Sequence, residues 1–393
     1  MTRHAGHGNY DECIAVIEID PPVRRQDVGL PQRANRGTHS LNIGEIARRA
    51  GVSRSTISYA LSGKRTISET TRRRIQDVID ELGYRPNAAA RALKEGRTRT
   101  IGLIIPPAGA RLTDMQLRFI AGTVDAAARV DLDVLLSSSG GDHDRSFERV
   151  VTGGRVDGVV VMEIRMEDPR VVQLQQSHLP FVAIGRTARP DDLCWADIDY
   201  RSLVAECVQH LADLGHRHIA LINRSAEMLS AGYAPARRAQ AGFSDAIAQR
   251  GITGIQLCCA DDQAAGRACI AAILAARPKV TGVVTITEAA LGGVQRGLER
   301  SGLVVPRDFS ITGVVARHWA EDFDPPLTAA DVPAAEMCSH AVALLVERIR
   351  DPAQPYRSVM LAPPICLRGS TGPAPAARSV RAAALSSRRA RSA

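Results

Sequence analysis

The pattern of apolar positions divides this chain into a short helical segment and a longer region of alternating elements. Between residues 41 and 93, apolar side chains recur every three or four residues, the spacing of one helix face. From Thr100 onward, short apolar runs alternate with amphipathic stretches, as in βα units around parallel sheets. The sequence therefore predicts a small all-α segment followed by an α/β core.

The helical segment begins with two short helices joined by a tight turn. The first helix has inward positions spaced i, i+3, i+4, i+7, namely Ile43, Ile46, Ala47 and Ala50. Gly51 ends it, because a residue without Cβ readily adopts the left-handed conformation of a helix C-terminus. Ser53 can cap the second helix. That helix buries Ile57, Ala60 and Leu61 and exposes Arg54, Ser55 and Tyr59.

A third helix is predicted from the N-cap Ser68 to a stop at Gly83. Its inward stripe is Ile75, Val78, Ile79 and Leu82. Three helices around one small apolar centre make a module of about fifty residues, close to the smallest that folds alone. The pattern predicts a helix-turn-helix, whose recognition helix meets base edges in DNA, although ordinary helix pairs share parts of it.

Charge distinguishes this segment from the rest of the chain. Residues 41 to 99 hold 13 Lys and Arg against 6 Asp and Glu, a net charge of +7, while the whole chain carries +8. A basic surface of this kind is typical of proteins that bind the phosphate backbone, although a solvated basic face looks the same. The tail from Pro373 adds five Arg and no acid, which we expect to raise sequence-independent DNA affinity.

The alternating region divides into two series of βα units. The first has predicted strands at Ile101 to Ile105, Leu132 to Leu136, Val156 to Val161 and Phe181 to Ile184. The second has them at Ile219 to Ile222, Ile255 to Cys258, Val280 to Ile286 and Phe309 to Val315. Helical stretches such as Thr113 to Val130 and Pro235 to Arg250 separate the strands. Two series of similar size predict two doubly wound parallel-sheet subdomains.

Composition narrows the class of protein further. No run of eighteen apolar residues and no apolar signal core is present, so we expect a cytoplasmic protein with no membrane partner. The eight Cys show no Cys-x-x-Cys spacing, and we expect neither a metal nor a cofactor. Phosphate-binding loops, nucleophile elbows and dinucleotide fingerprints are absent, so the sequence gives no support for an enzyme. His216 and His218 have no third ligand nearby and are interpreted as structural.

Three blocks of sequence carry a family resemblance. They are Ala50-Gly51-Val52-Ser53-Arg54-Ser55-Thr56-Ile57-Ser58, Ile67-Ser68-Glu69-Thr70-Thr71-Arg72, and Leu82-Gly83-Tyr84-Arg85-Pro86-Asn87 continuing to Leu93. In this order and spacing they resemble the DNA-binding headpiece of the lactose-repressor/galactose-repressor (LacI/GalR) family of bacterial transcriptional regulators. The later region resembles the periplasmic-binding-protein-like effector core of the same family, so the resemblance covers residues 41 to about 372.

The resemblance assigns DNA contacts to the first two helices. It implies that Arg54 and Ser55 read bases in the major groove with Tyr59 beside them. It also implies that Asn42, Ser53 and Thr56 hold phosphates and set the register. The family often has Arg where this chain has Tyr59, and a phenol cannot make the bidentate contact to guanine. Arg54 is the alternative residue for that contact.

The segment from Pro86 to Lys94 resembles the hinge helix of the family. In the family, two such helices pair in the minor groove, where the residue matching Leu93 wedges between base pairs. Asn87 would contact DNA, and Ala90 would let the paired helices approach closely. The alternative is a plain helical linker with Leu93 docked on the core.

The resemblance also implies an effector site in the cleft between the subdomains, on loops after the strands. By the family pattern the candidates are Arg186, Asp199, Arg238, Glu288, and Arg317 or its neighbour His318. At two places this chain differs from the family pattern and lacks side chains that usually contact sugar hydroxyls. Ala239 stands where the family often has Arg, and Val315 or Ala316 where it has Asp. A plain hexose is therefore a less secure effector here than in a typical member.

These expectations define five segments and a function. We predict a disordered extension at 1–40, a helix-turn-helix domain at 41–85, a hinge helix and linker at 86–99, an effector-binding and dimerisation core at 100–372, and a disordered basic tail at 373–393. The family implies a homodimeric repressor that binds a pseudo-palindromic double-stranded DNA operator at the nucleoid and responds to a sugar-like small molecule. The alternative hypothesis is a solute-binding or carbohydrate-active protein whose N-terminal helices serve assembly only.

Overall fold

The computed structural model describes residues 43–62, 65–83, 92, 96–106, 112–139 and 144–375. Contacts within the chain divide it after Pro86 into two units. The predicted extension at 1–40, most of the basic tail, and the predicted DNA contacts Asn42, Asn87, Ala90 and Leu93 lie outside the described residues.

The first unit contains the three predicted helices, α1 (Ile43–Arg49), α2 (Arg54–Ser62) and α3 (Glu69–Leu82). Their facing sides bury Ile46, Ala47, Ala50, Ile57, Ile75 and Ile79 in one small core. Ser68 caps α3 by accepting a hydrogen bond from the Thr71 amide at 3.2 Å. Gly83 ends the helix at φ 58°, a left-handed conformation that costs glycine little. The sequence-based helix-turn-helix is confirmed.

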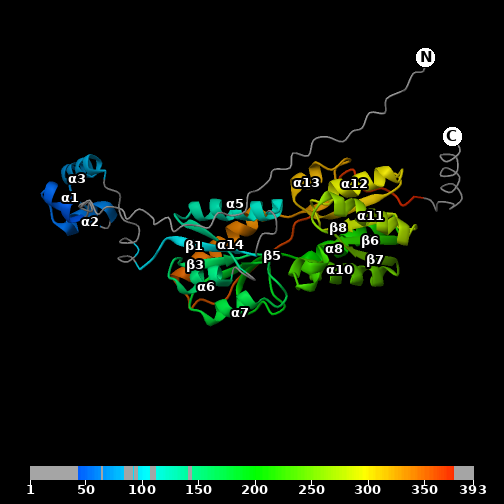
Figure 1. Cartoon of the computed structure of the whole chain (residues 1–393), viewed down its shortest axis with the longest axis horizontal. Coiled ribbons are helices and arrows are strands. Elements are labelled where there is room, and N and C mark those ends of the chain that lie inside the picture. The colour runs from blue at the N-terminus through cyan, green and yellow to red at the C-terminus, as the bar shows by residue number, and fades with distance from the viewer. Residues whose placement is uncertain are drawn as a thin grey trace, which may run out of the picture. The chain divides into compact units, whose positions relative to one another are not determined.

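The first subdomain of the second unit is built on a six-stranded sheet in the order β11-β5-β4-β3-β1-β2. Its strands are β1 (Thr100–Ile105), β2 (Asp133–Ser138), β3 (Gly158–Val161), β4 (Phe181–Ile184), β5 (Cys194–Ile198) and β11 (Ser358–Leu361), all parallel. Its helices are α5 (Asp114–Ala128), α6 (Asp144–Thr152), α7 (Pro169–Gln176) and α14 (Ala334–Arg350). Figure 1 shows α5 and α14 on one side of this sheet and α6 and α7 on the other.

The second subdomain repeats this order as β12-β10-β9-β8-β6-β7. Its strands are β6 (His218–Asn223), β7 (Thr253–Cys258), β8 (Gly282–Thr285), β9 (Ser310–Val315), β10 (Thr328–Asp331) and β12 (Ile365–Cys366), of which only β12 is antiparallel to its neighbour. Its helices are α8 (Tyr200–Asp213), α9 (Ala226–Ser230), α10 (Ala234–Arg250), α11 (Gln263–Ala276), α12 (Leu291–Arg300) and α13 (Arg317–Glu321). The predicted pair of doubly wound subdomains is confirmed.

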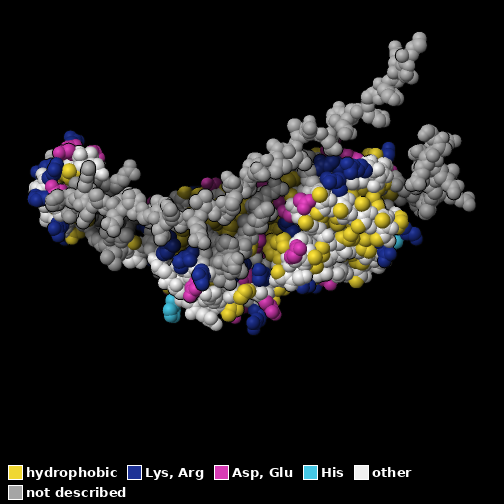
Figure 2. Space-filling model, viewed as in Figure 1, with side chains coloured by type: hydrophobic (Ala, Val, Ile, Leu, Met, Phe, Trp, Pro, Cys, Tyr) yellow, Lys and Arg dark blue, Asp and Glu magenta, His cyan; other side chains and the backbone are white. Residues whose placement is uncertain are grey.

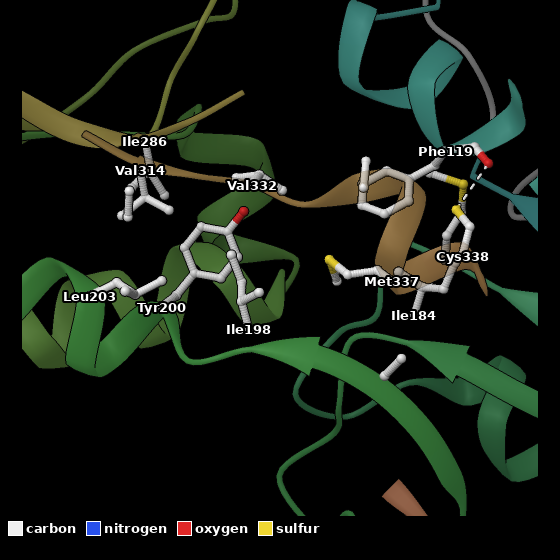
Figure 3. Packing of buried hydrophobic residues seen from close by; sticks show 14 of the residues in the cluster. Phe119, Ile184, Ile198, Tyr200, Leu203, Ile286, Val314, Val332, Met337 and Cys338 are labelled. Atoms are coloured by element: carbon white, nitrogen blue, oxygen red, sulfur yellow. Dashed lines mark hydrogen bonds between the residues drawn. The ribbon is translucent and has the colours of Figure 1, made fainter. Parts of the chain in front are cut away.

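Both faces of each sheet are covered, which explains the continuous apolar runs in the sequence. In β1, Ile101 and Leu103 join the cluster beneath α5 and α14, while Ile104 points into the cluster beneath α6 and α7. The cluster beneath α5 and α14 continues into the second subdomain through Tyr200 and Val332 (Figure 3). The two subdomains therefore share one apolar core where the chain passes between them.

The chain passes between the subdomains three times, after β5, after β10 and after β11. After β10 the chain thus returns to the first sheet as α14, where it buries Met337, Cys338 and Val342. The apolar spacing of this helix is that of a core element but does not indicate which sheet it covers. Across the described ranges, no helix combines the length and apolar character needed to cross a membrane.

Candidate functional site

The N-terminal half of α2 presents an exposed polar face. The Ser53 hydroxyl accepts a hydrogen bond from the Thr56 amide at 3.1 Å, because the first N–H groups of a helix lack carbonyl partners. The same hydroxyl lies 2.6 Å from the Ser55 hydroxyl and 2.8 Å from that of Thr56. Arg54 and Ser55 are exposed, and Arg54 has no ion pair with the residues that the structure describes. This helix end therefore offers a guanidinium and a cluster of hydroxyls at one surface.

Two acidic side chains of this unit pair with arginines away from α2. Glu45 pairs with Arg48 and with Arg49 in α1, and Arg49 reaches Glu81 of α3 at 3.0 Å. Tyr59 is half-buried, and the guanidinium carbon of Arg65 lies 5.5 Å from its ring centroid. The exposed face of α2 therefore keeps its positive charge available for a polyanion.

A cavity lies between the two subdomains, at the carboxyl ends of the strands. Its volume is about 50 Å³, room for a few water molecules, whereas ligand pockets usually span roughly 300–1,000 Å³. The lining residues are Met115, Phe119, Met162, Glu163, Ile164, Ile184, Gly185, Asp197, Tyr200, Arg224, Tyr233, Pro235, Val332 and Met337. A larger ligand therefore requires the subdomains to move apart.

A wider hollow of about 300 Å³ lies beside Arg97 and Asp157, at the amino ends of β1 and β3. It is larger, but it lies at the wrong end of the sheet. In open α/β sheets, ligands bind at the carboxyl ends of the strands, where loops from both series converge. The cleft is therefore the candidate ligand site in spite of its smaller volume.

Three of the five predicted effector residues converge on a carboxylate that the sequence reading missed. Asp197, at the end of β5, accepts a hydrogen bond from Arg186 at 3.1 Å and lies 3.9 Å from Arg238. Arg186 also reaches Asp199 at 3.3 Å. Burial raises the pKa of Asp197 to about 6, although both guanidinium groups oppose this rise. Burial also acts on Asp199, but Ser202 and Arg186 hold its pKa below the ordinary value.

Glu288 lies in a second buried cluster, around Arg224. It is 4% exposed, and its carboxylate accepts a hydrogen bond from the Ala316 amide. Burial raises the pKa of Glu288 to about 7, against the influence of Arg224 and of that amide. Arg224 lies 3.6 Å from Asp261, and its Nε has no hydrogen-bond partner among the described residues.

Several hydrogen bonds hold the cleft closed, and we call them the clasp. Arg238 of α10 donates to the main-chain oxygens of Arg186 at 2.8 Å and Thr187 at 2.9 Å across the cleft. Main-chain bonds join Ala234 to Ile164 and Met166 to Gly232. On the other rim, Asp114 of α5 meets His318 at 3.1 Å and accepts from Trp319 at 3.3 Å. The clasp therefore joins both rims of the cleft.

Arg317 is not brought to the cavity. Its side chain is 70% exposed and pairs with Asp331 at 3.1 Å at the start of α13. The cavity lining instead includes Glu163, Asp197 and Arg224, which the sequence reading did not select. Glu163 and Arg224 follow predicted strands, so the rule of choosing loops after strands could have included them, whereas Asp197 lies within β5, which was not predicted.

Comparison with known proteins agrees with this architecture. Residues 42–87 match the family described as bacterial regulatory proteins, lacI family, and residues 208–371 match the periplasmic binding protein-like domain. The HTH-type transcriptional regulator AglR of Rhizobium meliloti (strain 1021) is 29% identical over 345 residues, 85% of this chain and 95% of AglR.

Solved structures extend the match to the three-dimensional fold. The transcriptional regulator CelR in complex with cellobiose is 25% identical, with a TM-score of 0.62, and covers 84% of this chain and 99% of its own. The lac repressor dimer bound to operator and the anti-inducer ONPF shares the fold at a TM-score of 0.74 and 20% identity, over 84% of this chain and 99% of its own. With its helix-turn-helix unit and two-subdomain core, this chain belongs to the lacI family of bacterial regulatory proteins and is a DNA-binding transcriptional regulator rather than an enzyme.

Proposed function

We propose that this regulator is a homodimeric repressor whose hold on a pseudo-palindromic operator is set by a small, sugar-like molecule in the cleft. The observation that carries the proposal is the combination, in one chain, of an exposed α2 face bearing Arg54 with a closed cleft between two subdomains. A binding event that changes the closure of the cleft can shift the population competent to bind DNA. We propose the cytoplasmic nucleoid as its place of action.

The proposed DNA contacts follow from the exposure of α2. Arg54 and Ser55 stand at the N-terminal half of the helix, where side chains reach base edges in the major groove. Ser53 and Thr56 place hydroxyls beside them for phosphate contacts. Tyr59 is half-buried under Arg65, which favours a supporting contact over base reading. Asn42 completes the proposed set from outside the described residues.

Dimerisation is supported by apolar side chains that the core leaves exposed. Leu117 and Val124 of α5 are 50% and 45% exposed, and Leu136 of β2 is 46% exposed. In the second subdomain, α11 exposes mainly alanine, and Figure 2 shows hydrophobic side chains gathered around α11 and β7. Exposed apolar surface of this kind marks protein interfaces, so we propose that a second copy covers these faces.

The proposed effector site is the cleft, with Arg186, Asp199, Arg238 and Glu288 as residues that respond to the ligand. The first three belong to the network around Asp197, and Arg238 is also part of the clasp. A ligand that replaces the contacts of Arg238 would open or close the cleft. Arg317 is left out of this set because Asp331 holds it at the surface.

The test is a gel shift with the upstream region of the gene at roughly 150 mM salt, where nonspecific binding is weak. We expect specific retention by a dimer and a change in affinity with a sugar library. Leu93→Ala is expected to lower operator affinity by about 1–3 kcal/mol through loss of a minor-groove wedge, with effector affinity unchanged. No preference for any duplex over random competitor overturns the regulator, and a monomer on the operator in sedimentation overturns the dimer.

A further inference from the structure

One carboxylate that lines the cleft cavity, that of Glu163, has no ion pair with any residue that the structure describes. Glu163 follows β3 and has φ 55°, a left-handed conformation that is costly for a residue with a side chain. Arg170 donates to its main-chain oxygen at 3.0 Å, which holds this segment in place. The backbone is thus fixed in a strained form that places Glu163 at the cavity.

The neighbour of Glu163 is fixed in orientation as well. The Gln116 side-chain oxygen accepts a hydrogen bond from the Thr113 amide at 2.9 Å, within the capping box of α5. Its Nε2 must therefore point away from Thr113, and it donates to Glu163 Oε1 at 2.7 Å. Glu163 is consequently an acceptor on this side, and its other oxygen has no hydrogen bond with a described residue.

Charge around the cavity is not balanced. Arg224 is the cation among the lining residues and already lies beside Asp261, while Glu288 is a further buried carboxyl near it without an ion pair in the described part of the chain. Three carboxyl groups thus share one guanidinium. Burial raises the pKa of Glu163 above its ordinary value, as it does for Glu288, and the hydrogen bonds and the nearby Arg224 only partly oppose this rise.

Aromatic rings and methionines form the remaining walls. Phe119 of α5, Tyr200 of α8 and Tyr233 beside α10 line the cavity together with three methionines, Met115, Met162 and Met337. Figure 3 shows Tyr200 and Phe119 on either side, with Val332 and Met337 between them. Ring faces carry partial negative charge and attract a cation, most strongly where water is excluded.

These features discriminate between ligand classes. A carboxylate or phosphate would lie against Glu163 and beside an Arg224 that other carboxyl groups already engage, and a neutral sugar would leave the Glu163 carboxylate without a counter-charge. A protonated amine supplies that charge and suits the rings. Arg224 also lines the cavity, and its Nε, which has no hydrogen-bond partner among the described residues, matches a hydroxyl group of a ligand.

We propose that the effector of this regulator carries a protonated amine together with hydroxyl groups, as in an amino sugar, and that the amine binds Glu163 between Phe119, Tyr200 and Tyr233. This inference rests on the proposed function, since it names the chemical class of the cleft ligand. It makes Glu163 the specificity-determining residue.

The test is calorimetry on the full-length chain with matched probes: glucose, glucosamine and glucuronate, and the corresponding galactose series. At least one amine is expected to bind about tenfold or more tightly than its neutral and acidic counterparts. Glu163→Gln should remove that preference with little effect on the neutral sugar. Glu167→Gln, an exposed residue four positions along the same loop, is the matched control and should behave as wild type.

Three results would overturn the inference: a neutral or acidic sugar that binds as tightly as the amine, an unchanged amine affinity in Glu163→Gln, or no binding of either amine at about 10 mM. Operator binding is measured on the same preparation. If the protein binds the operator and a neutral sugar releases it, the proposed regulatory function is supported and the proposal of an amine-bearing effector is wrong. If no operator is retained, the proposed function itself fails.

Discussion

The exposed face of α2 and the lining of the cleft use polar side chains in opposite ways. On α2, the side chains of Arg54 and Ser55 are exposed to solvent and contribute little to the stability of the fold. In the cleft, Asp197 and Glu288 are almost fully buried and tied to neighbours from several elements. A change on α2 should therefore alter DNA binding alone, whereas a change in the cleft should alter stability and ligand response together.

The largest effect is expected for Asp197→Ala. Removal of this carboxylate leaves Arg186 and Arg238 facing each other, both largely buried, without their shared partner. We expect the free energy of unfolding to fall by about 3–5 kcal/mol in urea denaturation at neutral pH. Asp199→Asn, at a carboxylate that is 37% exposed, should cost less than about 1 kcal/mol. An equal fall in the free energy of unfolding of the two variants would contradict the expected difference between a buried and an exposed carboxylate.

The pH dependence of stability comes next. The pKa of Glu288 is about 7 in the folded chain and 4.5 in an ordinary environment, so the folded state keeps a proton that the unfolded state has lost. Stability therefore falls as pH rises from about 4.5 to 7, by roughly 3 kcal/mol from this group. In Glu288→Gln this contribution disappears. The measurement is urea denaturation of both proteins at pH 5 and pH 8. An equal fall in the free energy of unfolding of wild type and variant between these two pH values would contradict the prediction.

Arg54→Ala should show the opposite profile. Loss of one bidentate base contact is expected to weaken operator binding by about 1–3 kcal/mol and to relax sequence preference at one position. Unfolding should change by less than about 0.5 kcal/mol, because the side chain is exposed and unpaired with described residues. Fluorescence anisotropy measures the affinity of wild type and variant for operator and for random duplex, and the comparison tests whether Arg54 reads a base. An equal loss on both sequences would make Arg54 a phosphate contact.

The smallest expected effect is at the end of α3. Gly83→Ala places a Cβ on a residue at φ 58°, at a cost of about 1 kcal/mol. Because the helix-turn-helix unit has a small core, we expect hydrogen exchange of the α3 amides to rise about fivefold while exchange in the sheets stays constant. Faster exchange in both units would show that they unfold together.

The same contrast explains what the sequence could predict. The three helices of the first unit were predicted because their caps, stops and apolar spacing are local signals, as Ser68 and Gly83 illustrate. The strands with continuous apolar runs were also predicted. β5 was missed because Asp197 interrupts its run Cys194–Ile198, and this buried charge is stabilised by Arg186 and Arg238 from distant segments.

The residues of the candidate site were likewise predicted only where the sequence carried a signal for them. Arg186, Asp199 and Arg238 were chosen by a family pattern and do meet, but the pattern had no means of naming Asp197 at their centre. Glu163 and Arg224 gave no motif, since their importance arises from a cavity formed by both subdomains. Arg317 was chosen by its place after a strand, yet Asp331 draws it to the surface.

The clasp has a consequence for timing. A molecule larger than a few waters can enter only while the bonds of Arg238 and Asp114 across the cleft are broken, so the rate of opening caps the rate of association. The measured affinity is also reduced by the fraction of time spent open. A regulator gated in this way would ignore brief pulses of its metabolite and respond to its persistence.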